Sequence, residues 1–267
     1  MKMSTCLLVL GLTLSLVAGS AGASMVAVFN NGSYSDTSGE VPNLTGSLAS
    51  LSHTVNNFSG IGAADFAAAT AGADALIIPE LEVGDLYAAL TPGAVTEIQN
   101  YVAGGGNIIT FGTWHNNGYV ESLLNNVFDD FALTIPMDQT YAGANLDVGN
   151  AAGTSFEGCP NWIPRANSTN GYELSELPGG ALSFYSGIET YTGNEVSVAF
   201  ASSYGAGSVI YLGFDWFEMP VPSEWECVLN AAVTYDGGDP VPEPASLTLM
   251  GLGLAGFVGR RIRKKNI

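Results

Sequence analysis

The sequence predicts one α/β domain in which a mostly parallel sheet has helices on both faces. Two observations lead to this fold class. Short, continuously apolar segments such as 74–79 are too apolar to have a wet face, which is typical of buried parallel strands. Segments with helical spacing of apolar residues lie between them. The domain is expected over residues 24–237, which is enough chain for one sizeable core.

The elements follow one another in alternation. The first strand, 25–29, ends at the turn residues Asn30-Asn31-Gly32. A helix is expected to begin at Thr91 and Pro92 and to end near Gly104, since Thr and Pro favour helix starts and Gly favours helix ends. The other expected elements are helices at 44–51, 63–71 and 223–233 and strands at 53–58, 74–79, 107–111 and 207–213.

A region between about 140 and 200 interrupts this alternation. It is rich in Gly, Asn, Ser and Tyr and contains only short strand-like pieces. We interpret it as a β insertion, either a hairpin or a surface loop region.

The N-terminal 23 residues predict a secretory signal peptide. Lys2 precedes the apolar run 6–18, and Ala21-Gly22-Ala23 offers the small residues that signal peptidase requires. Cleavage is expected after Ala23. The Sec export machinery and signal peptidase are the partners that this segment implies.

The last 30 residues, 238–267, have a different composition. An uncharged apolar stretch at 245–259 is followed by a basic block at 260–265. Such a pair favours a membrane helix with its basic end in the cytoplasm, although fifteen residues are fewer than the roughly 20 of a full span. The alternative is a helix packed on the domain, which would leave five like charges beside the packing surface.

Three features of this tail occur in a specific order. Pro242-Glu243-Pro244 comes first, the apolar stretch follows, and a basic end that begins with Arg260 and Arg261 closes the chain. This tail resembles the PEP-CTERM sorting signal of Gram-negative bacteria. The resemblance implies export, a transient anchor in the inner membrane, and recognition by an exosortase-like membrane enzyme. It also implies a final location at the cell surface or in the extracellular, biofilm-type matrix.

The charge of the domain excludes some functions. Between Ser24 and Val241 lie 24 of the 25 acidic residues but only one basic residue, Arg165. Nucleic acid is therefore not an expected partner. The same segment lacks lysine, which excludes Schiff-base chemistry. Cys159 and Cys227 could form a disulfide in an oxidising compartment, but their spacing leaves the pairing open.

Three stretches of the domain carry a second resemblance. They are ALIIPELE at 75–82, GGGNIITFGTWH at 104–115 and the closing run 205–233 that begins GAGSVIYLGFDW. They resemble the class I glutamine amidotransferase-like superfamily, including its ThuA-like branch, and imply a Rossmann-like (flavodoxin- or amidotransferase-like) fold. That superfamily pairs a cysteine with a histidine, but here Trp114 is near the cysteine position and Phe214 is at the histidine position. Glutaminase activity is therefore not expected.

Ligands of parallel α/β sheets bind beyond the carboxyl ends of the strands. Residues that we expect at that edge are Asn30, Asn31, Glu80, Glu82, Trp114, His115, Asp215 and Trp216. The candidate ligand set is Asn31, Glu80, Trp114, His115 and Asp215. Its carboxylates and histidine could bind a divalent cation, and its aromatic and amide groups could bind a sugar. The alternative is that these loops are polar because they meet water, and that Trp114 and Trp216 cap the core.

The sequence thus predicts an exported, non-catalytic surface or matrix protein that binds polysaccharide or cations. No cofactor other than a divalent cation is expected. The alternative is an exported carbohydrate-active enzyme of the ThuA-like type that uses Glu80, His115 and Asp215. His53, at the start of a strand, is expected to be structural or solvated. The ligand and the oligomeric state are left open.

Overall fold

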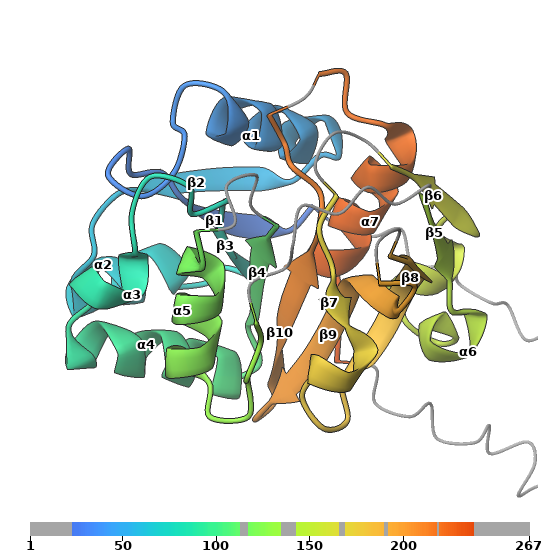
Figure 1. Cartoon of the computed structure of the whole chain (residues 1–267). Helices are drawn as coiled ribbons and strands as arrows, with labels where there is room; N and C mark the ends of the chain where they lie inside the picture. Colours follow the sequence, from blue (N-terminus) through green and yellow to red (C-terminus); the bar gives the residue numbers. More distant parts are fainter. Residues whose placement is uncertain are drawn as a thin grey trace, which may run out of the picture.

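The computed structural model describes residues 23–112, 117–134, 143–165, 169–189, 192–217 and 219–237, and one sheet runs through them (Figure 1). Five of its strands are parallel and lie in the order β2-β1-β3-β4-β10. They are β1 (Met25–Phe29), β2 (Thr54–Phe58), β3 (Ala75–Ile78), β4 (Asn107–Phe111) and β10 (Gly207–Leu212). All residues of β3, β4 and β10 are buried, as their continuous apolar sequences predict.

The predicted β insertion extends this sheet with antiparallel strands. β9 (Glu195–Tyr204) pairs with β10 through a tight turn, and the order continues through β8 (Leu182–Ile188), β5 (Gly143–Leu146) and β6 (Trp162–Pro164). The short β7 (Tyr172–Glu173) pairs with β9 beside this path. Most of β9 is buried, so the region belongs to the core of the domain rather than to a surface loop.

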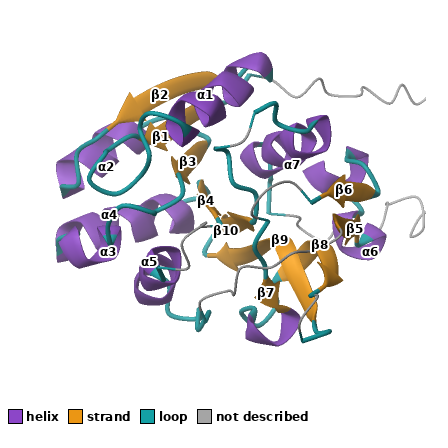
Figure 2. Cartoon of the chain, turned by 45° about the horizontal axis from the view of Figure 1, so that its top comes forward, coloured by secondary structure: helices purple, strands orange, loops and turns teal. Residues whose placement is uncertain are grey.

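Helices cover both faces of the sheet, which confirms the predicted fold class (Figure 2). One core is formed against α1 (Glu40–Ser50) and α7 (Ser223–Val233). The other core is formed against helices on the opposite face, which are α2 (Ala63–Thr70), α4 (Pro92–Ala103) and α5 (Tyr119–Val127). The remaining short elements are α3 (Leu86–Ala89), α6 (Val148–Ala151), η1 (Ser155–Gly158) and η2 (Leu174–Glu176).

Two of the longer helices, α1 and α5, differ from the prediction. The sequence pattern places the start of the first helix at residue 44, but α1 begins at Glu40, because Pro42 is tolerated in a first helical turn. Helix α5 was not predicted, although Val120, Leu123, Leu124 and Val127 have helical spacing and are buried. The segment is only nine residues long and follows a polar loop, so its helical spacing is a weak signal in the sequence.

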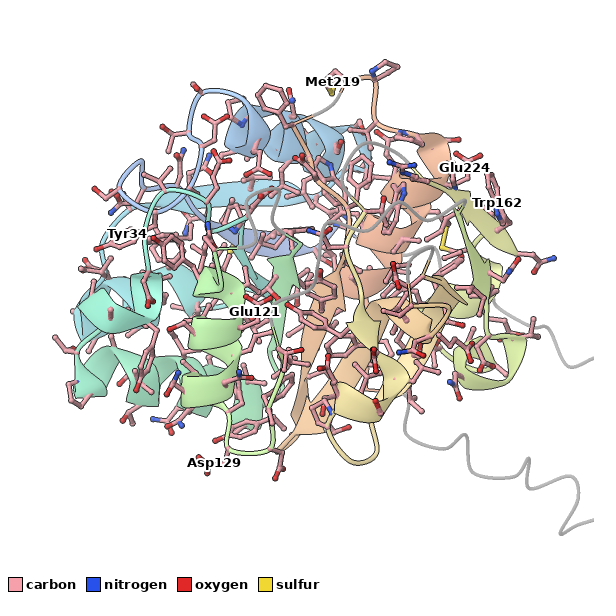
Figure 3. The ribbon with its side chains drawn as sticks, in the orientation of Figure 1. Tyr34, Glu121, Asp129, Trp162, Met219 and Glu224 are labelled. Atoms are coloured by element: carbon pink, nitrogen blue, oxygen red, sulfur yellow. A yellow bond between two sulfur atoms is a disulfide. The ribbon has the colours of Figure 1, made fainter. Side chains whose placement is uncertain are left out.

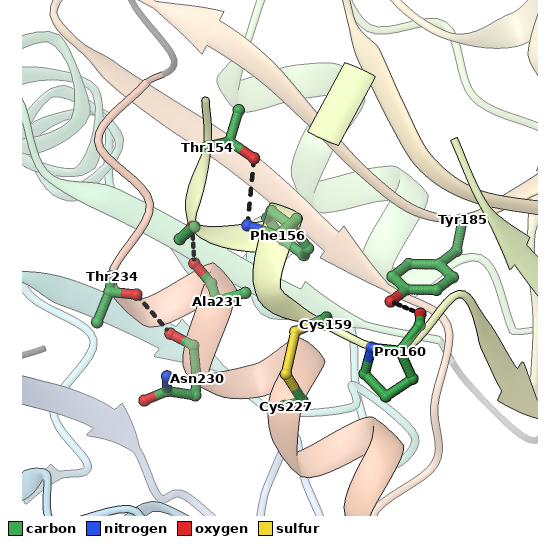
Figure 4. Close-up of a disulfide and its surroundings, with 10 residues drawn as sticks. Thr154, Phe156, Cys159, Pro160, Tyr185, Cys227, Asn230, Ala231 and Thr234 are labelled. Atoms are coloured by element: carbon green, nitrogen blue, oxygen red, sulfur yellow. Dashed lines mark hydrogen bonds between the residues drawn. A yellow bond between two sulfur atoms is a disulfide. The ribbon is translucent and has the colours of Figure 1, made fainter. Parts of the chain in front are cut away.

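A disulfide joins Cys159 and Cys227, whose Cα atoms are 5.7 Å apart (Figure 4). Cys159 directly follows η1, and Cys227 lies in α7. Two hydrogen bonds support this junction: Ser155 Oγ donates to Ala231 O at 2.6 Å, and Tyr185 Oη donates to Pro160 O at 2.6 Å. The bond therefore attaches the β insertion to the last helix of the domain.

The two ends of the described domain lie at one edge of the sheet. Ala23 and Ser24, just before β1, and Tyr235, just after α7, line the same cavity of about 700 Å³. Within the described residues no helix is long and apolar enough to cross a membrane. The helix predicted at 245–259 lies outside those residues.

Candidate functional site

Three acidic side chains meet beyond the carboxyl ends of the parallel strands. Glu80 follows β3, Asp215 follows β10, and Glu40 is the first residue of α1. Each side chain is only 2–3% exposed. One carboxylate oxygen from each residue lies within 4.8 Å of one from each of the others. We refer to Glu40, Glu80 and Asp215 as the carboxylate cluster.

Some oxygens of the carboxylate cluster have hydrogen-bond partners, and one has none among the described residues. The Asp215 Oδ1 atom accepts a hydrogen bond from the backbone nitrogen of Phe217 at 2.7 Å. Glu40 interacts with both Glu80 and Asp215. Its Oε2 atom, however, is buried without a hydrogen-bond partner among the described residues. A buried acceptor without a donor costs free energy, so this oxygen is available to a ligand.

The electrostatics of the cluster are unfavourable without a positive charge. Burial raises the pKa of Glu40 far above its usual range, and the negative charges of Glu80 and Asp215 raise it further. Arg165 is the sole Lys or Arg between Ser24 and Val241, so the sequence supplies little counter-charge. Either protons on the carboxylates or a bound cation must offset the repulsion.

Local turn chemistry directs Glu40 inward. The Asp36 side chain accepts hydrogen bonds from the backbone nitrogen of Ser38 at 2.8 Å and from its hydroxyl at 2.6 Å. A Cβ atom at Gly39 would lie 2.5 Å from Asp36 Oδ2 and 3.0 Å from the Phe217 ring, so a larger residue does not fit. Because Gly39 lies this close to Asp36 and Phe217, α1 can begin with the Glu40 side chain against the edge of the sheet.

Helix α1 is also tied to the loop that carries Asp215. The Asn43 side chain donates to the backbone oxygens of Trp216 at 3.0 Å and Phe217 at 3.2 Å. Trp216 is buried, and its ring contacts Phe111 and Phe214 at centroid distances of 4.9 and 4.6 Å. Phe217 is 61% exposed. The two residues that follow Asp215 are therefore one buried and one exposed aromatic residue.

The structure brings together two of the predicted site residues, Glu80 and Asp215. The Asn31 amide instead donates to Ser59 O at 2.7 Å, and its Oδ1 accepts from the Ser33 nitrogen at 2.9 Å, so it organises its own loop. Trp114 and His115 lie outside the described residues, and so does the sorting signal with Pro242, Glu243, Pro244, Arg260 and Arg261. Phe214 is fully buried against Trp225.

Sequence reasoning missed Glu40. It was not considered because the expected helix began four residues later. The available signal was an acidic residue directly after the turn-forming run Asp36-Thr-Ser-Gly39, which is where the first turn of a helix favours a carboxylate.

A second buried polar contact lies on the other face of the sheet. The Tyr172 hydroxyl of β7 donates to Glu121 Oε1 of α5. Figure 3 shows Glu121 on the side of α5 that faces the sheet. Glu121 Oε2 has no hydrogen-bond partner among the described residues, and burial raises the pKa of Glu121. The Glu121 carboxyl group, held by the Tyr172 hydroxyl, is therefore part of the core between α5 and β7.

Replacing Tyr172 with Phe should lower the free energy of unfolding by about 1–3 kcal/mol, because Glu121 Oε1 then loses its buried donor. Urea unfolding followed by tryptophan fluorescence measures this. Glu121→Gln is the matched control, since its carboxamide oxygen can accept the same bond and it should cost less. A Tyr172→Phe loss below about 0.5 kcal/mol would contradict the role given to this contact.

The C-terminal segment is similar to a known sorting motif. Residues 240–264 match the family model of the PEP-CTERM protein-sorting motif. The chain carries a PEP-CTERM sorting signal. This confirms the resemblance of the tail, and the motif implies an exported protein that is sorted through the membrane and processed by an exosortase-like enzyme. A search of curated proteins finds no significant sequence match.

The domain of this PEP-CTERM protein is similar in fold to solved structures. A ThuA-like protein from Bacteroides uniformis has a TM-score of 0.54 and 11% identity, over 81% of this chain and 94% of that chain. A ThuA-like protein from Parabacteroides merdae has a TM-score of 0.55 and 11% identity, over 81% of this chain and 91% of that chain. A β-galactosidase from Bacillus circulans has a TM-score of 0.50 and 11% identity, over 79% of this chain but 30% of that chain. These likenesses confirm the predicted ThuA-like fold.

Proposed function

We propose that this exported PEP-CTERM protein is a non-catalytic component of the cell surface or extracellular matrix that binds a divalent cation through the carboxylate cluster. The observation that carries the proposal is the convergence of three buried carboxylates, one of which has an oxygen with no hydrogen-bond partner in the described part of the chain. The two charges that act on Glu40 are both negative. A divalent cation supplies the missing positive charge.

The dimensions of the carboxylate cluster suit calcium. Calcium lies about 2.3–2.6 Å from its oxygen ligands. The three ligand atoms lie within 4.8 Å of one another, which is close enough for one ion to contact all three. Three carboxylates can provide up to about six of the 6–8 oxygens that calcium prefers. Magnesium keeps several waters, which favours calcium where the ligands are this buried.

A carbohydrate-active enzyme is the second candidate. A protonated Glu40 beside two further carboxylic groups is the arrangement that general acid–base catalysis of glycoside cleavage uses. A sugar would have to reach side chains that are 2–3% exposed, whereas an ion needs far less space. The cation is therefore the better supported occupant.

Calcium should raise the melting temperature of the domain, residues 24–237, because it binds the folded carboxylate cluster. At a concentration 100 times its dissociation constant, an ion stabilises by about 2.7 kcal/mol. Thermal unfolding with millimolar calcium, compared with sodium chloride of equal ionic strength, measures the effect. Glu40→Gln should abolish most of the increase.

Asp129→Asn is the matched control for this measurement. It removes one exposed carboxylate at the end of α5, away from the loop with Met219 (Figure 3). The variant should respond to calcium as the original domain does. Equal responses of Glu40→Gln and the original domain, or no response beyond that to sodium, would contradict the cation site. Hydrolysis of aryl glycosides that disappears in Glu80→Gln would instead establish the enzyme.

A further inference from the structure

The second feature of interest lies at the opposite edge of the sheet, where the domain begins. Ser24 directly precedes β1 and lines the cavity of about 700 Å³ together with Asp74, Tyr101 and Asn107. The backbone nitrogen of Thr54 donates to Ser24 O at 2.9 Å, so Ser24 is held against the start of β2. The first residue of the predicted mature chain is therefore already part of the fold.

The backbone nitrogen of Ser24 has a specific acceptor. It donates to Nδ1 of His53 at 3.3 Å. The other ring nitrogen of His53, Nε2, is 3.0 Å from Asn230 Oδ1, which can only accept. Nε2 therefore carries the proton, and Nδ1 is left as an acceptor. One residue further on, the Met25 nitrogen donates to Asp74 Oδ2 at 2.9 Å.

We propose that removal of the signal peptide creates an α-ammonium group on Ser24 that the domain binds between His53 and Asp74. The proposal rests on the export part of the proposed function and not on its cation site. Hydrolysis of the Ala23–Ser24 peptide bond gives a carboxylate on Ala23 and an amine on Ser24, which takes up a proton at neutral pH. The amide N–H that now faces His53 is then replaced by a cation with three donors.

The charges around this group favour the ammonium form. Asp74, the residue before β3, accepts from the nitrogen of Met25, which is the residue after Ser24, and its negative charge also acts on His53. Burial lowers the pKa of His53, so the imidazole remains neutral and does not repel the ammonium. The described residues at this edge include three other titratable groups: Tyr101, which donates to Ala73 O at 3.2 Å, Tyr235, and Asp236, which acts on Tyr235. In a domain with Arg165 as its sole Lys or Arg, the new N-terminus adds a second positive charge.

The sequence makes this group unusually easy to observe. No lysine lies between Ser24 and Val241, so a processed chain that ends before the tail has one primary amine. Any amine-reactive reagent then reports on the Ser24 amine alone.

The experiment uses the natural precursor with a stop codon after Gly237. This chain retains its signal peptide and every described strand and helix, including both cores, so it retains the whole fold. It is exported in a Gram-negative host, and intact mass identifies its N-terminus. Reaction with an N-hydroxysuccinimide ester is then followed at pH 7.5, for the folded protein and for the protein in urea. We expect the folded protein to react at least about tenfold more slowly, as for an amine whose pKa is raised by one unit.

Variants separate the charge effect from general protection. Asp74→Asn should bring the folded rate close to the rate in urea, whereas Asp74→Glu should keep the slow reaction. Asp129→Asn, on an exposed loop, is the control and should keep it as well. Circular dichroism shows that each variant is folded before its rate is compared. Equal rates for folded and unfolded protein, a slow reaction that persists in Asp74→Asn, or a mature N-terminus other than Ser24 would each overturn the proposal.

Discussion

Raising the pH from 5 to 8 in the presence of a chelator is expected to lower the free energy of unfolding of the 24–237 domain, with Glu40 contributing up to about 4 kcal/mol. The folded state raises the pKa of Glu40 above its ordinary value of 4.5. The folded protein therefore holds a proton that the unfolded chain releases. The stabilising contribution is complete below pH 4.5 and is lost steadily as the pH rises.

Two other groups titrate in the same experiment. Burial also raises the pKa of Glu121, which adds a slope of the same sign. The lowered pKa of His53 acts in the opposite direction, because its contribution to stability is present above about pH 6.5 and is lost as the pH falls. The contribution of Glu40 is therefore the difference between the domain and its Glu40→Gln variant, which keeps both other groups. Urea unfolding at several pH values measures it.

Calcium should remove this slope. A cation replaces the proton on Glu40, and its affinity rises with pH because the ligand oxygens must be deprotonated. The increase in melting temperature should therefore be larger at pH 8 than at pH 5. Parallel pH profiles for the original domain and Glu40→Gln in chelator would show that Glu40 is not the buried proton carrier.

The second large effect is expected from the disulfide. Replacing both Cys159 and Cys227 with serine should lower the free energy of unfolding by about 4 kcal/mol. The bond closes a loop with a sequence separation of 68 residues, and opening it increases the entropy of the unfolded chain. It also attaches the β insertion to α7, so the outer strands β5 and β6 should lose protection first.

Reduction of the original domain gives an independent measurement. The only other cysteine in the sequence, Cys6, precedes the 24–237 domain, so a reducing agent acts on this one bond. Reduction should produce the same loss as the double substitution and should leave the doubly substituted domain unchanged. Unfolding curves that do not move on reduction would contradict the expected contribution.

The parallel half of the fold could be predicted because its physical signals are local. A strand such as Ala75–Ile78 is apolar at every position since both of its faces are covered, and a continuous run of that kind is visible in sequence. Glu80 and Asp215 could be predicted for the site for the same reason, because the ends of such strands share one edge. A residue that directly follows one of these parallel strands therefore lies near the residues that follow its neighbours.

The antiparallel half and Glu40 could not be predicted with the same certainty. Strands β5 to β7 are two to four residues long. β5 pairs with β8 and β6, and β7 pairs with β9, so their signal is spread over distant residues. Glu40 joins the cluster from the start of a helix, at a depth that depends on the close approach of Gly39 to Phe217. Gly39 and Phe217 are far apart in the sequence, so the residues around Glu40 give little indication of this contact.

The shared position of Ser24 and Tyr235 places both ends of the described domain at one edge of the sheet. Both residues line the cavity at the edge where the parallel strands begin, and the strands then run about 17 Å to the edge with Glu80 and Asp215. The described chain ends at Gly237, close to this first edge, and the residues that match the PEP-CTERM motif follow it. If the tail holds the chain in a membrane, as the sequence predicts, we expect the edge with the carboxylate cluster to face the exterior.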